Sequence, residues 1–404
     1  MRVLLVNSLY PPADVGGAER SVEQLARSLV AAGVSTAVAT LVPLGKECVE
    51  TRDGVRIHRL PLRHLYWPYD GRRRPATRRA LWHGLEAVSS LMDGPLGRVV
   101  KAERPDLIHA HVTTGFGGAV VRTVRRAGLP LVQTLRDYST LCCRAALFRH
   151  GRSCAGSCLD CVLLTQGRRG ATERVDHVVG ISRAVLERHQ EAGCFRETPA
   201  TVIGNAAGGG GLAADGIGSR NGPLTFGFIG RVEPEKGIEV LLRATARLTG
   251  DWRLRIAGRG EAAYVERLRR TFVDDRIAWL GQTEASGFYQ DVDVVVAPAV
   301  WAEPFGRNVV EAAMQGRGVI ASRIGGLPEA TAGAGRVALV PPGDVEALAA
   351  VLARVLDQPA SWRNLVAPSK PVWTEASIAK AHVVLYRAVL ANRASRISAD
   401  LSQA

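Results

Sequence analysis

The sequence predicts an α/β protein made of two doubly wound domains, each built on a parallel sheet that helices cover. Its 404 residues are too many for one typical core and suit two domains. In both halves, short β-branched runs alternate with amphipathic stretches, and a Gly/Ala-rich stretch lies between the two alternations. Right-handed crossovers between parallel strands then place helices on both faces of each sheet.

Residues 1–200 form the first predicted domain. A strand at 3–6, a helix at 20–32 that ends before Gly33, and a strand at 35–41 make a β-α-β opening. Further strands are expected at 55–60, 107–110, 129–134 and 177–181. Since the intervening segments are long enough for helices, the sheet should be parallel.

Residues 201–223 are predicted to be a linker, because four consecutive glycines at 208–211 cannot hold regular structure cheaply. The second domain, 224–375, repeats the alternation. Its strands are expected at 224–229, 253–257, 277–280, 292–297, 319–321 and 337–340, with helices at 237–248 and 262–271. The last segment, 376–404, continues a helical pattern that begins at 375 and is expected to cross back onto the first domain.

The formal charge of +14 is uneven, because residues 1–200 carry 29 Lys and Arg against 18 Asp and Glu. This excess suits an anionic membrane surface, a lipid-phosphate acceptor or nucleic acid, although an Arg-rich composition alone also produces it. No nucleic-acid-binding module accompanies the charge, so nucleic acid is not expected as a partner. No run reaches the length of a membrane span and no signal peptide is evident, which favours a cytoplasmic location.

Three segments carry candidate chemistry at the ends of predicted strands. The loop after the first strand contains Gly16 and Gly17 before a helix, where backbone N–H groups can approach an anion. After the first strand of the second domain, Arg231 and Lys236 are five residues apart and could clamp a diphosphate. A solvated charged loop is the alternative for this pair.

The third segment begins at Glu303. Pro304 and Gly306 fit a turn into a helix whose free N–H groups at Phe305–Arg307 could hold phosphate. Glu311 follows roughly one turn into that helix. Two glutamates at such a spacing could also be ordinary solvated side chains.

Taken in order along the chain, these segments resemble the GT4 family of retaining glycosyltransferases, which have the GT-B fold: two Rossmann-like domains that face each other across a cleft. The matching segments are the first loop through Glu19, Gly230–Gly237, Ile256–Gly260, Glu303–Glu311 and Gly325–Glu329. The resemblance covers nearly the whole chain. It implies that the first domain binds the acceptor and the second binds a nucleotide diphosphate-sugar donor.

The resemblance also implies roles for single residues. Arg231 and Lys236 would neutralise the donor diphosphate, Glu303 would hold sugar hydroxyls, and Glu311 would bind the ribose. Backbone groups of Phe305, Gly306 and Arg307 would contact the sugar and phosphates, and Gly17 beside Gly16 would close over the diphosphate. With these cations present the leaving group needs no metal, and the family's course is retention of anomeric configuration. The sugar, the nucleotide base and the acceptor are not implied.

Two positions depart from the family pattern. Arg136, before Asp137, stands where relatives carry a His that touches the donor sugar, and an Arg cannot act as a base near neutral pH. His111, which follows a predicted strand, is a candidate substitute, though a structural role is the alternative. The second departure is Asn205-Ala206, where relatives have Asn-Gly. These departures keep open a catalytically silent sugar-nucleotide-binding or scaffold protein, and an epimerase or phosphorylase of the same fold remains a second alternative.

Five of the seven cysteines fall within residues 142–161. Four thiolates could bind a structural Zn²⁺, and by resemblance the ligands would be Cys142, Cys154, Cys158 and Cys161. An iron–sulfur cluster and reduced thiols are the alternatives.

A basic amphipathic segment precedes this loop. Arg72–Arg74, Arg78 and Arg79 are followed by Leu81, Trp82 and Leu85, a pattern that could rest on an anionic membrane where lipid-linked acceptors are presented. The alternative is a solvated helix near the acceptor cleft.

Overall fold

The computed structural model describes residues 1–13, 16–72, 74–206, 222–363 and 374–403, with side chains described as far as residue 395. The chain divides into two compact units. Unit 1 comprises Met1–Leu147, Ala155–Ala206 and Thr374–Ala404, and unit 2 comprises Phe148–Cys154 and Ala207–Trp373. The first unit therefore extends to Ala206 rather than to residue 200, and it includes the last helix of the chain. Most of the predicted linker lies outside the described residues.

Unit 1 is built on an eight-stranded sheet with the order β10-β9-β6-β5-β1-β2-β4-β3. The pairs are parallel except β3–β4, which is antiparallel at the edge. The strands are β1 (Arg2–Val6), β2 (Ser35–Val42), β3 (Cys48–Arg52), β4 (Val55–Pro61), β5 (Leu107–Ala110), β6 (Leu131–Leu135), β9 (His177–Gly180) and β10 (Ala200–Val202). The sequence predicted the parallel strands, apart from β10, to within about two residues, but not the antiparallel β3.

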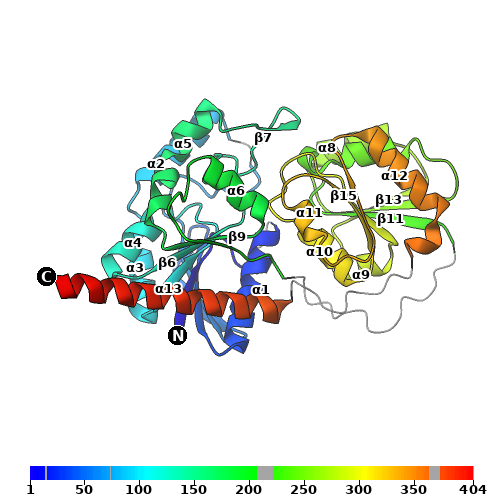
Figure 1. Ribbon diagram of the computed structural model, residues 1–404. Helices are drawn as coiled ribbons and strands as arrows, with labels where there is room; N and C mark the ends of the chain where they lie inside the picture. The colour runs from blue at the N-terminus through cyan, green and yellow to red at the C-terminus, as the bar shows by residue number, and fades with distance from the viewer. Residues whose placement is uncertain (14–15, 73, 207–221, 364–373, 404) are drawn as a thin grey trace. The chain divides into compact units, whose positions relative to one another are not determined.

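Helices connect these strands and cover the sheet (Figure 1). They are α1 (Gly17–Ala31), α2 (Ala76–Val88), α3 (Asp93–Glu103), α4 (Ala119–Ala127), α5 (Leu159–Ala171) and α6 (Arg183–Glu191), with the 3₁₀ turn η1 (Thr172–Arg174). Helix α1 shows why the pattern works: Val22, Leu25, Ala26 and Leu29 are buried on one face of the helix. This spacing places α1 against the sheet.

The last helix, α13 (Glu375–Gln403), belongs to unit 1 and runs beside α1 (Figure 1). Its Tyr386 is fully buried, and the Tyr386 hydroxyl lies 2.6 Å from Nδ1 of His109 in β5. At the start of the helix, Glu375 accepts hydrogen bonds from Gln24 and Ser28 of α1. The contacts of Glu375 and Tyr386 thus hold the C-terminal helix against unit 1.

Unit 2 has a six-stranded parallel sheet with the order β13-β12-β11-β14-β15-β16. Renumbered within the unit, this is the 3-2-1-4-5-6 order of a Rossmann fold. The strands are β11 (Leu224–Ile229), β12 (Trp252–Ala257), β13 (Ile277–Gly281), β14 (Val294–Ala297), β15 (Gly318–Ser322) and β16 (Val337–Val340). The helices are α7 (Ile238–Thr245), α8 (Ala262–Thr271), α9 (Ala285–Gln290), α10 (Arg307–Met314), α11 (Leu327–Ala330) and α12 (Val345–Asp357), with the turns η2 (Pro234–Lys236) and η3 (Pro359–Ser361).

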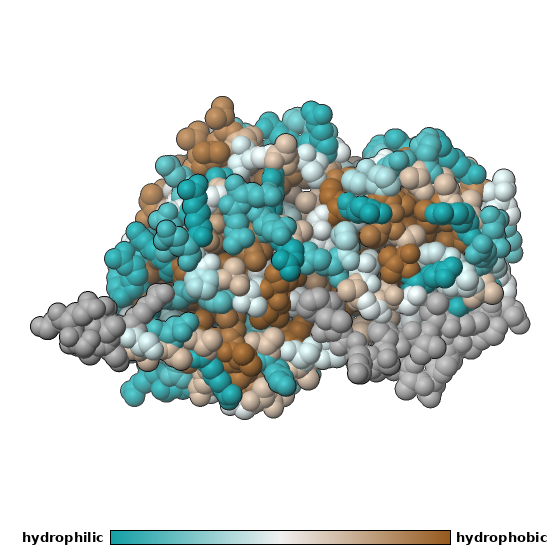
Figure 2. All heavy atoms as spheres, viewed as in Figure 1, coloured by the Kyte–Doolittle hydropathy of each residue, from teal (hydrophilic) through white to brown (hydrophobic). Residues whose placement is uncertain are grey.

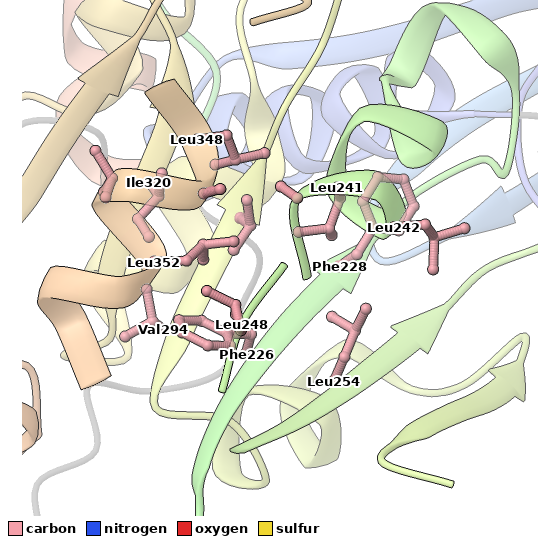
Figure 3. Close-up of a cluster of buried hydrophobic side chains, with 14 of the residues drawn as sticks. Phe226, Phe228, Leu241, Leu242, Leu248, Leu254, Val294, Ile320, Leu348 and Leu352 are labelled. Atoms are coloured by element: carbon pink, nitrogen blue, oxygen red, sulfur yellow. The ribbon is translucent and has the colours of Figure 1, made fainter. Parts of the chain in front are cut away.

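The core of unit 2 lies between this sheet and the helices α7 and α12. Figure 3 shows Phe226 and Phe228 of β11 packed among leucines of both helices. These buried side chains fix the strand whose carboxyl end carries Arg231. Unit 2 also contains the short hairpin of β7 (Phe148–Arg149) and β8 (Arg152–Ser153), which the sequence did not predict.

Candidate donor and acceptor sites

The candidate donor site begins where β11 and β14 end side by side at the centre of the unit 2 sheet. In a sheet of this order the strand connections diverge between these two strands, and ligands bind at their carboxyl ends. The loops after both strands are held together, because the Val300 N–H donates to the Glu235 carbonyl at 3.0 Å. A Cβ on Gly237 would lie 1.8 Å from the Pro298 carbonyl oxygen, so this approach requires glycine.

This arrangement brings Lys236 and Glu303 into contact. Lys236 Nζ lies 2.5 Å from Glu303 Oε2, and Trp301 Nε1 donates to the same oxygen at 2.9 Å. The ammonium group also lies 5.1 Å from the centre of the Trp301 ring. The sequence predicted both charged residues but missed Trp301, whose position two residues before Glu303 was an available signal.

The backbone of Glu303 is fixed by the Gly325–Gly326 turn. The Gly326 N–H donates to the Glu303 carbonyl at 2.7 Å. Gly325 has a φ of +57°, and a Cβ there would lie 2.3 Å from the Glu303 carbonyl oxygen. The turn therefore positions Glu303 through contacts that a larger residue would disturb.

Arg231 is half exposed and lies beside two carboxylates. Its Nη1 is 2.7 Å from Glu233 Oε2, and its Nη2 is 3.9 Å from Glu235. Burial, with a hydrogen bond to Glu235, raises the pKa of Glu233 to about 7, against the opposing charge of Arg231. Glu233 therefore changes its charge near neutral pH next to the cation expected to bind phosphate.

Helix α10 begins at the same edge of the sheet. Gly306 takes a φ of +97° as its N-cap, and Phe305 before it is buried. Arg307 donates from Nε to Glu311 Oε1 at 2.7 Å, while the Tyr289 hydroxyl donates to Glu311 Oε2 at 2.9 Å. The predicted Glu311 is thus present at the site but is already bound by two side chains.

In unit 1, the candidate residues lie at the carboxyl ends of β1, β5 and β6. Gly16 caps α1, and its N–H donates to the Glu19 carboxylate at 3.1 Å. Gly17 is the first residue of α1, and the two residues before Gly16 lie outside the described ranges. Because Glu19 already accepts from Gly16, an anion at this turn would compete with that carboxylate.

Arg136, which departs from the family pattern, donates from Nε to His111 Nδ1 at 3.2 Å and from Nη1 to Asn205 Oδ1 at 2.6 Å. His111 is buried, and burial with the charges of His109 and Arg136 holds its pKa well below the ordinary value. A neutral ring that accepts at Nδ1 carries its proton on Nε2. In the described part of the chain that Nε2 has no hydrogen-bond partner. His111 is therefore placed as a hydrogen-bond donor and not as a base.

Asp137 follows Arg136 directly at the same strand end. Its carboxylate accepts from the Ser139 N–H at 2.8 Å, and burial raises its pKa. Near it is Tyr69, whose hydroxyl has a hydrogen bond with Ser8 and whose pKa is raised by burial and by the charges of Asp137 and Glu19. Sequence reasoning missed Tyr69, which lies in an irregular loop where no periodic pattern marks it.

The cysteine loop places three thiols close together. Cys161 Sγ is 3.5 Å from Cys142 Sγ and 3.9 Å from Cys143 Sγ, and Cys158 caps helix α5. The thiol of Cys143, which was not among the predicted ligands, thus belongs to this cluster. Across the described residues, no group of three or more His, Cys, Asp or Glu side chains has the arrangement of a metal site. The four-cysteine zinc site stays a prediction.

Two family models together match most of the chain. Residues 16–206 match a glycosyl transferase 4-like domain, and residues 223–358 match glycosyl transferases group 1. A protein in the cps region of Klebsiella pneumoniae is 30% identical over 81% of this chain and 87% of its own length. The chain belongs to the GT4 glycosyltransferases. It is therefore a glycosyltransferase that uses a nucleotide-sugar donor.

Solved structures agree on the GT-B fold of this GT4 glycosyltransferase. Sucrose-phosphate synthase from Thermosynechococcus elongatus has a TM-score of 0.74 at 21% identity, covering 97% of this chain and 99% of its own. Anabaena HepE in complex with UDP-glucose has a TM-score of 0.63 at 18% identity and covers all of both chains. The two doubly wound sheets described above are the two halves of that fold.

Proposed function

We propose that this glycosyltransferase transfers a sugar with retention of configuration from a donor whose diphosphate is held on unit 2 by Arg231 and Lys236, with no metal in the catalytic step. The observation that carries the proposal is the 2.5 Å contact between Lys236 Nζ and Glu303 Oε2 at the carboxyl ends of β11 and β14. One group is a cation for phosphate, and its partner is an acceptor for sugar hydroxyls. The pair therefore lies where the phosphate and the sugar of one donor meet.

Departure of the nucleotide diphosphate builds negative charge on its phosphates. Lys236 and Arg231 would stabilise that charge, and the positive end of the α10 helix dipole would add to it. Once the donor has taken over Lys236 from Glu303, these groups are already in place and need little reorganisation during the reaction. Glu303 would accept hydrogen bonds from sugar hydroxyls, and Glu311 would do the same for the ribose after exchange with Tyr289.

We place the acceptor on unit 1, with His111 and Asp137 as its nearest polar groups. The Nε2–H of His111 is a buried donor that an oxygen atom of the substrate could satisfy. Arg136 holds that ring in place and adds positive charge. The support for this acceptor site is the geometry of His111, Arg136 and Asp137 within unit 1.

We further propose that the acceptor is carried by a lipid at the inner face of the membrane, with the protein in the cytoplasm and bound peripherally. No helix among the described residues is long and apolar enough to cross a membrane. The basic segment of unit 1 supports attachment to an anionic surface instead. A glycan or a small molecule is the alternative acceptor.

The donor site is tested by thermal-shift measurements with UDP, GDP, ADP and TDP and their sugar conjugates, since a ligand that binds the native state raises its apparent stability. We expect a shift with one nucleotide family, and its loss in Arg231→Ala and Lys236→Ala. Arg270→Ala, in an exposed ion pair of the same unit, serves as the matched control. No shift with any nucleotide would refute the donor site, and binding without transfer to any acceptor would favour a catalytically silent protein.

A further inference from the structure

The exposed apolar side chains of this protein are concentrated on one pair of helices. Seven of the fifteen large hydrophobic residues that are exposed in the described ranges lie on α2, on the turn after it, or on α5. They are Leu81, Leu85, Val88, Leu91, Leu159, Val162 and Leu163. We call these residues the α2–α5 ridge. Figure 2 shows apolar side chains gathered over this part of unit 1.

The two helices pack closely against each other. On α2, Leu81, Leu85 and Val88 recur at the spacing of one helical face. A Cβ on Gly167 of α5 would lie 3.3 Å from the Ala87 Cβ, so the glycine allows close packing of the helices. Beneath this contact the buried Glu86 of α2 pairs with Arg168 of α5. The apolar side chains are therefore held outward by a packed interior.

Exposed arginines border the α2 side of the ridge, while the one acidic residue in the first turn of α5 is Asp160. Arg72, Arg78 and Arg79 are exposed at the start of α2, and Arg73 lies outside the described residues. The guanidinium of Arg78 lies 5.6 Å from the centre of the Tyr66 ring, which places an aromatic residue at the same edge. Apolar side chains bordered by arginines and an aromatic ring are the composition of a surface that lies in the headgroup region of an anionic bilayer.

The apolar and basic groups argue for a single occupant. A second copy of the chain carries the same arginines at this surface, so a symmetric contact would bring like charges together. An anionic bilayer matches both at once, because acyl chains accept the leucines while lipid phosphates pair with the arginines.

We propose that the α2–α5 ridge is the surface by which this protein docks on an anionic phospholipid bilayer. The docking surface includes α5 as well as the basic segment that precedes α2. The proposal rests on the proposed function, in which the acceptor is carried by a membrane lipid. The ridge itself lies outside the donor site, so its binding to lipid can be tested without measuring catalysis. Leucines from two helices would enter the interface together, so removal of one helix's contribution should weaken binding sharply.

The test is sedimentation of the full chain with vesicles of phosphatidylcholine alone or with 30% phosphatidylglycerol. We expect binding to the anionic vesicles, weaker binding at high salt, and a drop of at least about tenfold in the partition coefficient for Leu81→Gln/Leu163→Gln. Arg78→Gln/Arg79→Gln should lose the preference for anionic lipid. Val384→Gln on α13, 60% exposed in the same unit, is the control that should bind as the parent does.

Each other outcome overturns the proposal. The ridge is not a docking surface if the parent binds no vesicles, or if the double leucine variant binds as well as the control. A dimer that the leucine substitutions dissolve, without vesicle binding, would assign the ridge to a second copy instead. The thermal shift caused by nucleotide is measured in the parent protein and in the same variants. If the parent shows no such shift, the result counts against the donor site and not against the ridge.

Discussion

Lys236 and Glu303 are 67 residues apart in the chain, yet their charged atoms lie 2.5 Å from each other. Each side chain is about four-fifths buried, with exposed fractions of 20% and 17%. The cation and the carboxylate thus neutralise each other before any ligand is present. A donor diphosphate must take over Lys236 from Glu303, which frees the carboxylate for the sugar.

Glu303→Gln should separate donor binding from transfer. The substitution leaves Lys236 without its carboxylate, so the affinity for nucleoside diphosphate should hold or rise. Transfer should fall about a hundredfold or more, because a group expected to act on the sugar is lost. Calorimetry and initial rates measure the two effects, with Glu346→Gln, in an exposed ion pair, as the control. Unchanged turnover would remove Glu303 from the site.

Glu233 should make donor affinity depend on pH. Its pKa is raised to about 7, so above neutrality a carboxylate competes with phosphate for Arg231. Affinity for the sugar nucleotide should therefore fall as the pH rises from 6 to 8. The diphosphate of a sugar nucleotide is a diester and does not titrate in this range, so the change reports on the protein. Glu233→Gln should flatten the curve, and a curve of equal slope in that variant would contradict this reading.

Gly325→Ala should damage the site by moving Glu303. An alanine there must adopt a positive φ, which costs roughly 1–2 kcal/mol, and its Cβ would also overlap the Glu303 carbonyl. Gly333 has a φ of +89° with open space around its Cβ position, so Gly333→Ala carries only the backbone cost. Chemical denaturation and transfer rates of the two variants should differ, with Gly325→Ala the weaker in both. Equal losses would mean that the contact with Glu303 has no effect.

Acid should loosen α13 from unit 1. Burial lowers the pKa of His382 to about 4 from 6.5, so the unfolded chain binds a proton at pH values where the native His382 does not. Stability from this group is complete above pH 6.5 and is lost as the pH falls toward 4. Between pH 7 and pH 5 the loss is roughly 2 kcal/mol. Denaturation of His382→Gln should show a weaker pH dependence over this range, whereas an unchanged dependence would assign it to other groups.

Zinc binding can be decided by metal analysis of protein purified without chelator. The prediction of a site at Cys142, Cys154, Cys158 and Cys161 requires one zinc per chain and its loss in Cys158→Ser. Cys48 is exposed and outside the loop, so Cys48→Ser should keep the metal. Metal-free protein with five titratable thiols in the loop would identify the cluster as reduced cysteines.

Strand positions were accessible from the sequence because each buried β-branched run is a local pattern. The strands β5, β11 and β16 match their predicted bounds residue for residue. The contacts within the sites could not be predicted in this way, because the partners of Arg136, Glu311 and Lys236 depend on which strand ends lie side by side in the fold. The sequence also made His111 a candidate, but only its contact with Arg136 indicates which ring nitrogen carries the proton.

Some residues of the sites carry a weak sequence signal or none. Tyr69 approaches Asp137 from an irregular loop, and Trp301 could equally have been an ordinary core residue. The exposed apolar side chains of α5 were not predicted, because apolar residues at helical spacing are more often part of a buried face.

The packing of α13 on unit 1 means that unit 1, whose sheet is synthesised before unit 2, is completed after it. The sheet strand β5 emerges early, but Tyr386, which caps His109 in its interior, is added about 277 residues later. Until α13 is added, His109 and the face of α1 that contacts α13 lack their packing partners. Unit 2 can complete its core before α13 is available, so a ribosome-bound chain would carry a folded unit 2 while unit 1 is still incomplete.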